Sequence, residues 1–170
     1  MKYFISIVII IFSLSSCRKI RSLPPEPSIK FRSFEVYDTT DILGNQIKGG
    51  RLTFYFEDGD GDLGMSEQGY SDFDTTNLFL TLLRESKGII VPAPDNDPLK
   101  PIGYRIPYME RQGQNKILKG IIKVTFFYFF YSPADTIYYE FYIKDRAGNL
   151  SNTERTCRIV LKNNGICTGE

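Results

Sequence analysis

Three aspartates alternate with glycine and leucine in one short segment, and their carboxylates could hold a cation. Asp58, Asp60 and Asp62 stand in FEDGDGDLG, directly after a run of apolar and aromatic residues. Calcium binds roughly six to eight oxygen atoms, and glycines let the backbone curl so that carboxylates face one point. The spacing therefore predicts a calcium loop. The alternative is a metal-free turn, because Asp-Gly pairs are common in turns and two carboxylates about 5 Å apart in water repel by only about 0.8 kcal/mol.

A second polar segment, DRAGN, could supply further oxygen ligands. Asp145 and Asn149 carry side chains that suit calcium, whereas Arg146 or Lys144 could neutralise the aspartates without a metal. Further acidic candidates are Asp72 and Asp74.

The composition argues against most enzyme chemistry. The 170 residues include no histidine, and histidine is the commonest general base. Asp95 and Asp97 form an acid pair that could serve a carboxylate-dependent hydrolase, but loop acids of this kind usually solvate a turn. We therefore expect a protein that is not an enzyme.

The N-terminus indicates export. Lys2 precedes the apolar run Tyr3–Phe12, which is shorter than the roughly 20 residues needed to span a bilayer. The next residues, Leu14-Ser15-Ser16-Cys17, resemble the lipobox of bacterial lipoproteins. That resemblance implies cleavage before Cys17 and acylation of Cys17 with chains such as palmitate, which would anchor the protein in an envelope membrane. The outer membrane is the expected location, because no aspartate follows Cys17; the alternative is an ordinary secretory signal.

The sequence divides into three parts. Residues 1–16 form the signal peptide, 17–27 form the lipidated cysteine and a proline-rich tether, and 28–170 form one domain. Cleavage removes Lys2, one of 21 basic residues, and leaves 20 against 20 acidic residues. A balanced charge gives no general attraction to nucleic acid, so we expect none as a partner.

Alternation of apolar and polar residues predicts an all-β domain. RLTFYFE (51–57) places Leu52, Phe54 and Phe56 on one face, and an earlier strand from Ser28 should be irregular near Ser33. DTIYYEFYIKD places a second apolar set inward: Ile137, Tyr139, Phe141 and Ile143. NLFLTLLRE (77–85) is apolar on both faces, as a central strand would be, and a strand from 152 to 161 should complete the sheet. About seven antiparallel strands after the signal peptide and tether indicate a β-sandwich.

Two further features concern surface and stability. Residues 86–114 are rich in proline and predict edge strands and long connections.

The aromatic run FFYFFY (126–131) has one face in the core. Its other face could be a platform for a sugar ring or a partner protein, or could be buried by Tyr104 and Tyr108. Cys157 and Cys167 would form a disulfide worth roughly 2–3 kcal/mol in an exported protein, unless both are free thiols.

The last third resembles immunoglobulin-like and fibronectin type III-like domains. Asp135, Tyr139 and Phe141 have the spacing of a tyrosine corner, which implies that the Tyr139 hydroxyl bonds to upstream backbone. The chain departs from that family in having no tryptophan. The implied Ig-like topology places the loops after the second and sixth strands at the same end, so Asp60 and Asp145 should be neighbours.

These observations together predict a lipid-anchored, non-catalytic Ig-like domain that binds a protein or glycan partner, with a calcium-stiffened loop end as its working surface. The alternatives are a structural subunit of an envelope complex and a carboxylate-dependent hydrolase.

Overall fold

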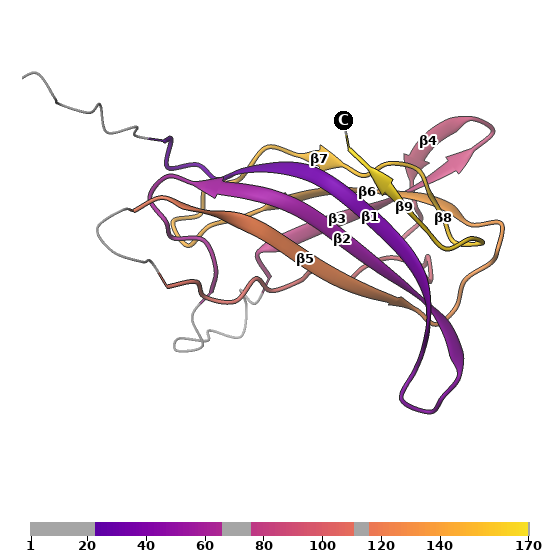
Figure 1. Cartoon of the computed structure of the whole chain (residues 1–170). Coiled ribbons are helices and arrows are strands. Elements are labelled where there is room, and N and C mark those ends of the chain that lie inside the picture. Colours follow the sequence, from indigo (N-terminus) through magenta and orange to yellow (C-terminus); the bar gives the residue numbers. More distant parts are fainter. Residues whose placement is uncertain (1–22, 66–75, 111–115, 170) are drawn as a thin grey trace, which may run out of the picture.

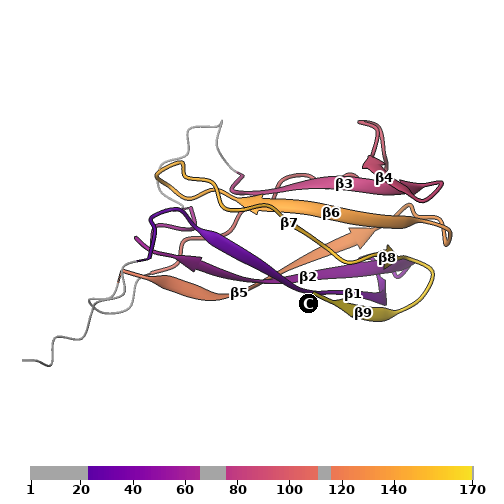
Figure 2. The same cartoon turned by 90° about the horizontal axis from the view of Figure 1, so that it is seen from above.

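The protein is a two-layered all-β sandwich in a computed structural model that describes residues 23–65, 76–110 and 116–169. The signal segment, Cys17, residues 18–22, Asp72 and Asp74 lie outside the described residues. The first sheet has the order β5-β2-β1-β9 and the second the order β4-β3-β6-β7, with β8 also paired to β6. Figure 1 shows the strands, and Figure 2 shows the two sheets stacked as layers. The bounds are β1 Ser28–Thr40, β2 Gln46–Asp58, β3 Leu78–Ser86, β4 Ile89–Pro92, β5 Leu118–Tyr128, β6 Thr136–Ile143, β7 Glu154–Arg155, β8 Ile159–Val160 and β9 Gly165–Thr168.

The strand order is that of an Ig-like sandwich, and it confirms the predicted fold class. The second strand lies between the first and fifth in one sheet, while the third and sixth are neighbours in the other. Every pairing between named strands is antiparallel. In the described part of the chain no helix is long and apolar enough to cross a membrane.

The predicted inward faces form the core. Leu52 and Phe54 of β2 and Ile137, Tyr139 and Phe141 of β6 are all inaccessible to solvent. The ring centroids of Phe54 and Phe141 lie 5.2 Å apart across the two sheets. The irregularity expected in β1 is also present, as a register shift between Phe31 and Ser33.

The C-terminal part departs from the predicted seven strands. The strand expected over 152–161 divides into β7 and β8, and β9 was not predicted, so the described residues form nine strands. The division occurs at Thr156, whose hydroxyl accepts the hydrogen bond from the Tyr139 amide at 3.0 Å in place of a backbone carbonyl. A side chain that replaces a ladder acceptor interrupts the regular pairing of β6 with the following chain.

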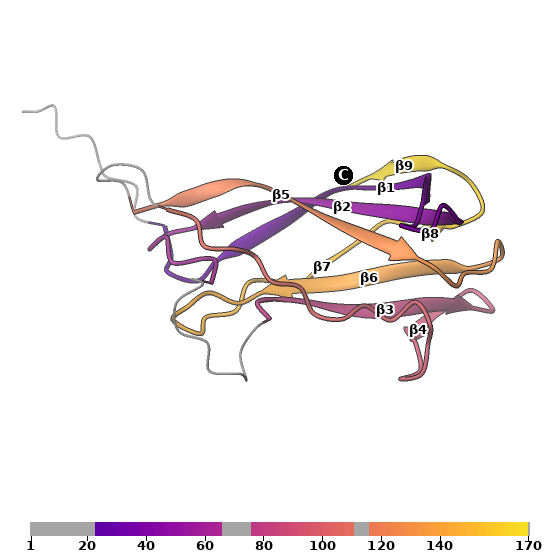
Figure 3. The ribbon, with the colours of Figure 1, turned by 90° about the horizontal axis from the view of Figure 1, so that it is seen from below.

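The connection from β3 to β5 follows the prediction for proline-rich sequence. It supplies the short edge strand β4 and then runs as an irregular segment along the side of the sandwich between β5 and β3 (Figure 3). Tyr104 holds it there, because its amide and carbonyl both bond to Leu78 at 3.0 Å. β3 is interior to its sheet, and Phe79 on its outer face stacks on Tyr142 with ring centroids 4.9 Å apart.

The sandwich has two distinct ends. Ser28 pairs with Glu57, so the chain enters the domain beside the acidic loop that follows β2. We call this the tether end. The β1–β2 hairpin, the β3–β4 turn and the β5–β6 connection all lie at the other end, which we call the hairpin end (Figures 2 and 3).

Candidate functional site

The acidic loop brings three carboxylates together at the tether end. One oxygen each from Asp58, Asp60 and Asp62 lies within 4.8 Å of the others. Asp58 is fully buried, and its oxygens accept hydrogen bonds from the amides of Leu63 at 2.7 Å and Gly61 at 3.3 Å. Gly61 has a φ of 68°, which a residue with a side chain rarely adopts. The glycine therefore allows the chain to fold back over Asp58.

Electrostatics make this cluster costly without a cation. The pKa of Asp58 is raised to about 6, first by burial and then by a hydrogen bond with the Asp60 carboxyl. The pKa of Asp62 is also raised, first by burial and then by the charges of Asp145 and Asp60. One oxygen each of Asp60 and Asp62 is buried without a hydrogen-bond partner. Buried acceptors that lack a donor are suited to a hard cation such as calcium.

The second loop lies against the first, as the Ig-like topology predicts. The Ala147 amide donates to the Asp62 carboxylate at 3.0 Å, and the Arg146 amide donates to the Asp62 carbonyl at 3.4 Å. The Arg146 guanidinium donates to the Gly64 carbonyl at 2.7 Å and lies 5.0 Å from the centre of the Tyr108 ring. The predicted juxtaposition of the two loops is confirmed.

Asp145 and Asn149, however, do not join the three carboxylates. The Asp145 carboxylate accepts the Asn149 amide at 2.8 Å and the Asn149 side-chain nitrogen at 2.9 Å. Asp145 therefore caps its own turn, a use of aspartate that competes with metal binding. In this geometry the cluster of the described residues consists of the three loop aspartates, and Asp145 acts on Asp62 through its charge.

Sequence reasoning missed the contact between the acidic loop and the tether. A Cβ at Gly59 would lie 2.1 Å from the Pro24 carbonyl oxygen and 2.6 Å from that of Leu23. Glycine is thus required at this position because the tether backbone crosses it. A glycine next to an aspartate suggested only a turn, and no pattern in the sequence indicated the crossing chain.

The tyrosine-corner prediction is wrong in its hydrogen bond. The Tyr139 hydroxyl pairs with the Tyr128 hydroxyl at 3.1 Å instead of with upstream backbone, because its ring points into the core toward the end of β5. Asp135 stabilises the connection between β5 and β6 and pairs with Arg84. Its carboxylate accepts the Ser132 amide and a guanidinium nitrogen of Arg84, each at 2.6 Å.

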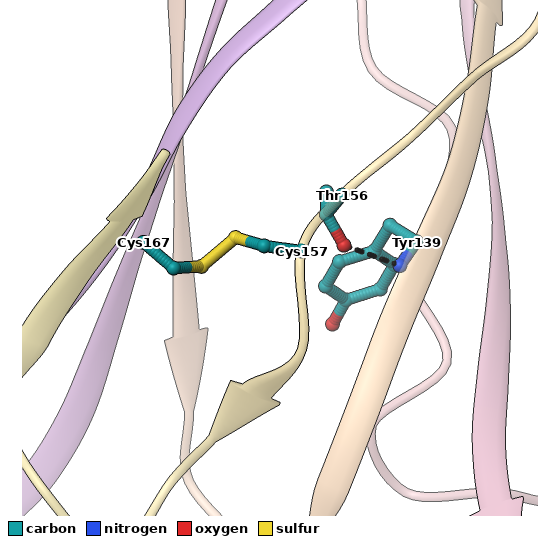
Figure 4. Close-up of a disulfide and its surroundings, with 4 residues drawn as sticks. All are labelled: Tyr139, Thr156, Cys157 and Cys167. Carbon is teal, nitrogen blue, oxygen red and sulfur yellow. Dashed lines mark hydrogen bonds between the residues drawn. A yellow bond between two sulfur atoms is a disulfide. The ribbon is translucent and has the colours of Figure 1, made fainter. Parts of the chain in front are cut away.

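Cys157 and Cys167 form the predicted disulfide, with Cα atoms 6.1 Å apart. Cys157 lies between β7 and β8, which belong to the second sheet, and Cys167 lies in β9 of the first sheet. The bond therefore joins the two sheets at the C-terminal edge, next to Thr156 and Tyr139 (Figure 4).

The aromatic run leaves one face exposed. Phe126 and Tyr128 are buried, whereas Phe127, Phe129 and Phe130 are 53%, 57% and 78% exposed. The interpretation that Tyr104 and Tyr108 cover this face is wrong. Tyr104 packs edge-on against Phe126 on the core side, with ring centroids 5.2 Å apart, and Tyr108 contacts Arg146 at the tether end. Phe130 leaves the alternation because β5 ends at Tyr128.

Fold and site together define an Ig-like β-sandwich with a candidate cation loop at one end and exposed aromatic rings at the other. Comparison with known proteins finds no matching family model, no matching curated protein and no matching solved structure. The function must therefore be argued from the residues themselves.

Proposed function

We propose that this protein is a lipid-anchored envelope lipoprotein whose Ig-like domain binds a protein or glycan partner without catalysing a reaction. The observation that carries the binding function is the exposure of large apolar side chains at the hairpin end. Phe129 and Phe130 directly follow β5 at the same end of the sandwich as the β1–β2 hairpin, whose tip residues Ile42 and Leu43 are 101% and 81% exposed. Large apolar patches on soluble domains tend to be interaction sites.

The position of this surface fits an anchored protein. The tether enters at the opposite end, beside the acidic loop, so a lipid on Cys17 would direct the hairpin end away from its own membrane. β2 alone has 13 residues, which corresponds to about 40 Å at about 3.3 Å per residue. We therefore propose the hairpin end, and not the acidic loop, as the surface that binds the partner.

The anchor has a direct test. Cells that express the wild-type chain and Cys17→Ser would be fed a clickable palmitate analogue, and the membranes would then be fractionated. We expect label and outer-membrane location for the wild type and neither for Cys17→Ser. Unlabelled wild-type protein would exclude the anchor.

The binding function is tested with matched surface variants. Purified wild type, Phe130→Ala and Ile166→Ala would be applied to a glycan array and used to capture partners from solubilised envelope. Ile166 is similarly exposed but lies on β9, so it serves as the control. Binding that Phe130→Ala loses and Ile166→Ala keeps supports the proposal, and equal retention by both variants contradicts it.

Calcium binding at the acidic loop is the second part of the proposal. It is supported by the three convergent carboxylates and their buried oxygens without partners. Bound calcium would hold the loop and the crossing tether rigid at the anchored end. The variant Asp60→Asn, compared with the wild type with and without calcium, tests this part.

Two alternatives remain distinct from this proposal. A structural subunit of an envelope complex would use the same apolar end, and it would co-purify with one partner at fixed stoichiometry. A carboxylate-dependent hydrolase has less support, because Asp97 is paired with Arg84, which lowers the pKa of Asp97, and Asp95 pairs with Lys100. Turnover in a broad hydrolase screen would favour it.

A further inference from the structure

Two adjoining cavities form a groove at the hairpin end. The first has a volume of about 300 Å³ and lies between the connection Pro98–Ile102 and the end of β5. The second, of about 530 Å³, continues from Phe129 to Tyr131 and Arg84. Pro98 and Phe129 line both cavities, so the two form one elongated groove instead of two separate pockets.

The walls of this groove are aromatic rings and prolines. Tyr104, Phe126 and Phe127 line the first cavity together with Pro98 and Pro101. The rings of Phe126 and Tyr139 are stacked with centroids 5.3 Å apart, which fixes the buried wall. Phe129 stands at the junction and is more than half exposed, so a ligand can reach it. Such a surface suits a flat apolar partner such as a proline ring.

The buried wall also contains a hydrogen-bond donor without an acceptor. Tyr128 and Tyr139 are 3% and 0% exposed, and their hydroxyls bond only to each other among the described residues. Two hydroxyls that share one hydrogen bond use one hydrogen and leave the second unbonded. Tyr139 has no exposed surface, so this hydrogen can meet a ligand only from the Tyr128 hydroxyl. An acceptor oxygen on the ligand would satisfy it there, and a donor left without an acceptor is costly in a buried site.

Acceptors are scarce in the same groove. Among the described lining residues Asp135 is the one carboxylate, and its two oxygens already accept hydrogen bonds from Arg84 and Ser132. The Lys100 ammonium at the rim is paired with Asp95. The groove therefore offers a ligand no free carboxylate, and its remaining side-chain acceptors are hydroxyl oxygens such as those of Tyr104, Thr125 and Tyr131.

We propose that this groove binds an extended, proline-rich peptide segment of a partner protein. A polyproline II helix needs no internal hydrogen bonds, offers carbonyl oxygens, and has no amide hydrogen at its prolines. Its rings fit aromatic-lined grooves, and its stiffness lowers the entropy cost of binding. A sugar fits this groove less well, because the one lining carboxylate, that of Asp135, is already bonded to Arg84 and Ser132 and is not free to accept from sugar hydroxyls. This inference rests on the proposed binding function and names its ligand.

The experiment uses fluorescein-labelled decaproline and the purified protein, with binding read by fluorescence anisotropy. A Gly-Ser decapeptide and a chitin tetrasaccharide competitor serve as ligand controls. The variants are Phe129→Ala, the double change Tyr128→Phe with Tyr139→Phe, and Ile121→Ala as a control on the outer face of β5. Ile121 is as exposed as Phe129 but does not line either cavity.

We expect decaproline to bind and the Gly-Ser peptide not to bind. Phe129→Ala should weaken binding by about tenfold or more, and Ile121→Ala should leave it unchanged. The double phenylalanine variant keeps both rings and should weaken binding by about 3- to 10-fold with little change in Tm. Weaker binding with an unchanged Tm would show that a hydroxyl donates to the ligand, whereas a purely structural role of the hydroxyls would lower the Tm.

Three results would overturn the inference. The first is no decaproline binding, and the second is binding that Phe129→Ala leaves intact. The third is binding of the chitin tetrasaccharide in place of the peptide, with the same dependence on Phe129. This last result would reject the peptide and keep the proposed binding function, whereas the glycan-array and capture experiment tests that function separately.

Discussion

Replacing Asp60 by asparagine distinguishes a calcium loop from a metal-free turn, because calcium binding predicts opposite effects with and without the metal. Asp60 raises the pKa of Asp58 through a hydrogen bond and through its charge. Asp60→Asn removes one negative charge and places an amide donor beside Asp58. The variant should therefore be more stable than the wild type without calcium, and it should lose most of the stabilisation that calcium provides.

The size of the metal-free effect follows from the pKa of Asp58. A rise from 3.8 to about 6 corresponds to roughly 3 kcal/mol, since one pKa unit is about 1.4 kcal/mol. Burial contributes the largest part, so removing the effect of Asp60 should recover on the order of 1 kcal/mol. For a domain of this size that is roughly 2–4 °C in Tm.

The sign with pH is equally specific. The folded pKa of Asp58 lies above its unfolded value, so ionisation of Asp58 destabilises the folded state. Without calcium, the contribution of Asp58 to the free energy of unfolding should fall as pH rises from about 4 to about 6, and acidification in that window should restore it. Calcium favours the ionised carboxylates and should reduce or reverse this dependence.

The assay is differential scanning calorimetry at pH 7 and pH 5, with EDTA or with millimolar calcium. For the wild type, calcium at about 100 times its Kd adds about 2.7 kcal/mol. Asp95→Asn is the matched control, because its carboxylate is fully exposed and lies outside the cluster. A calcium response that survives in Asp60→Asn, or a variant that is less stable than the wild type in EDTA, would refute the reasoning.

Three further predictions concern the tether, the disulfide and the two kinds of aromatic residue. Gly59→Ala should displace the chain at Pro24, because the added Cβ would lie 2.1 Å from the Pro24 carbonyl oxygen, and limited proteolysis should then cut that segment faster than in wild type. Cys157→Ala should lower the free energy of unfolding by about 3 kcal/mol, since it opens a short loop; identical urea midpoints for reduced and oxidised wild type would contradict this. Phe141→Ala should cost about 3–5 kcal/mol because the ring is fully buried, whereas Phe130→Ala should change stability by less than about 0.5 kcal/mol. Similar losses for both variants in urea denaturation would show that Phe130 is packed.

The regular strands could be predicted because their information is local. Alternation in β2 and β6 identifies the inward residues, such as Phe54 and Phe141, and the strand order then brings their two following loops together. The approach of Ala147 to Asp62 was therefore predictable from topology, although the two residues are 85 positions apart.

Side-chain partners were less predictable because several groups compete for each polar atom. The Asp145 carboxylate could reach toward the acidic loop or cap its own turn. It caps the turn, because Asn149 is only four residues away and donates two hydrogen bonds to it. The spacing of Asp135 and Tyr139 suggested a backbone partner for the Tyr139 hydroxyl. In the core this hydroxyl instead forms a hydrogen bond with the Tyr128 hydroxyl. β9 was not predicted because its sequence, GICT, shows no alternation of apolar and polar residues. It pairs with β1, which is far away in the sequence, and its Cys167 is bonded to Cys157.

The position of β1 between β2 and β9 determines how the domain responds to mechanical load. β1 is paired with β2 from Ser28 to Thr40, and part of it is also paired with β9 on its other side. Hydrogen bonds between antiparallel strands lie across the strand direction, so a pull on the chain ahead of Ser28 loads many of them at once, in shear. A partner that grips the hairpin end while the N-terminus is held would apply this load along the strand. Under such a load the hydrogen bonds of β1 would share the force instead of breaking one after another.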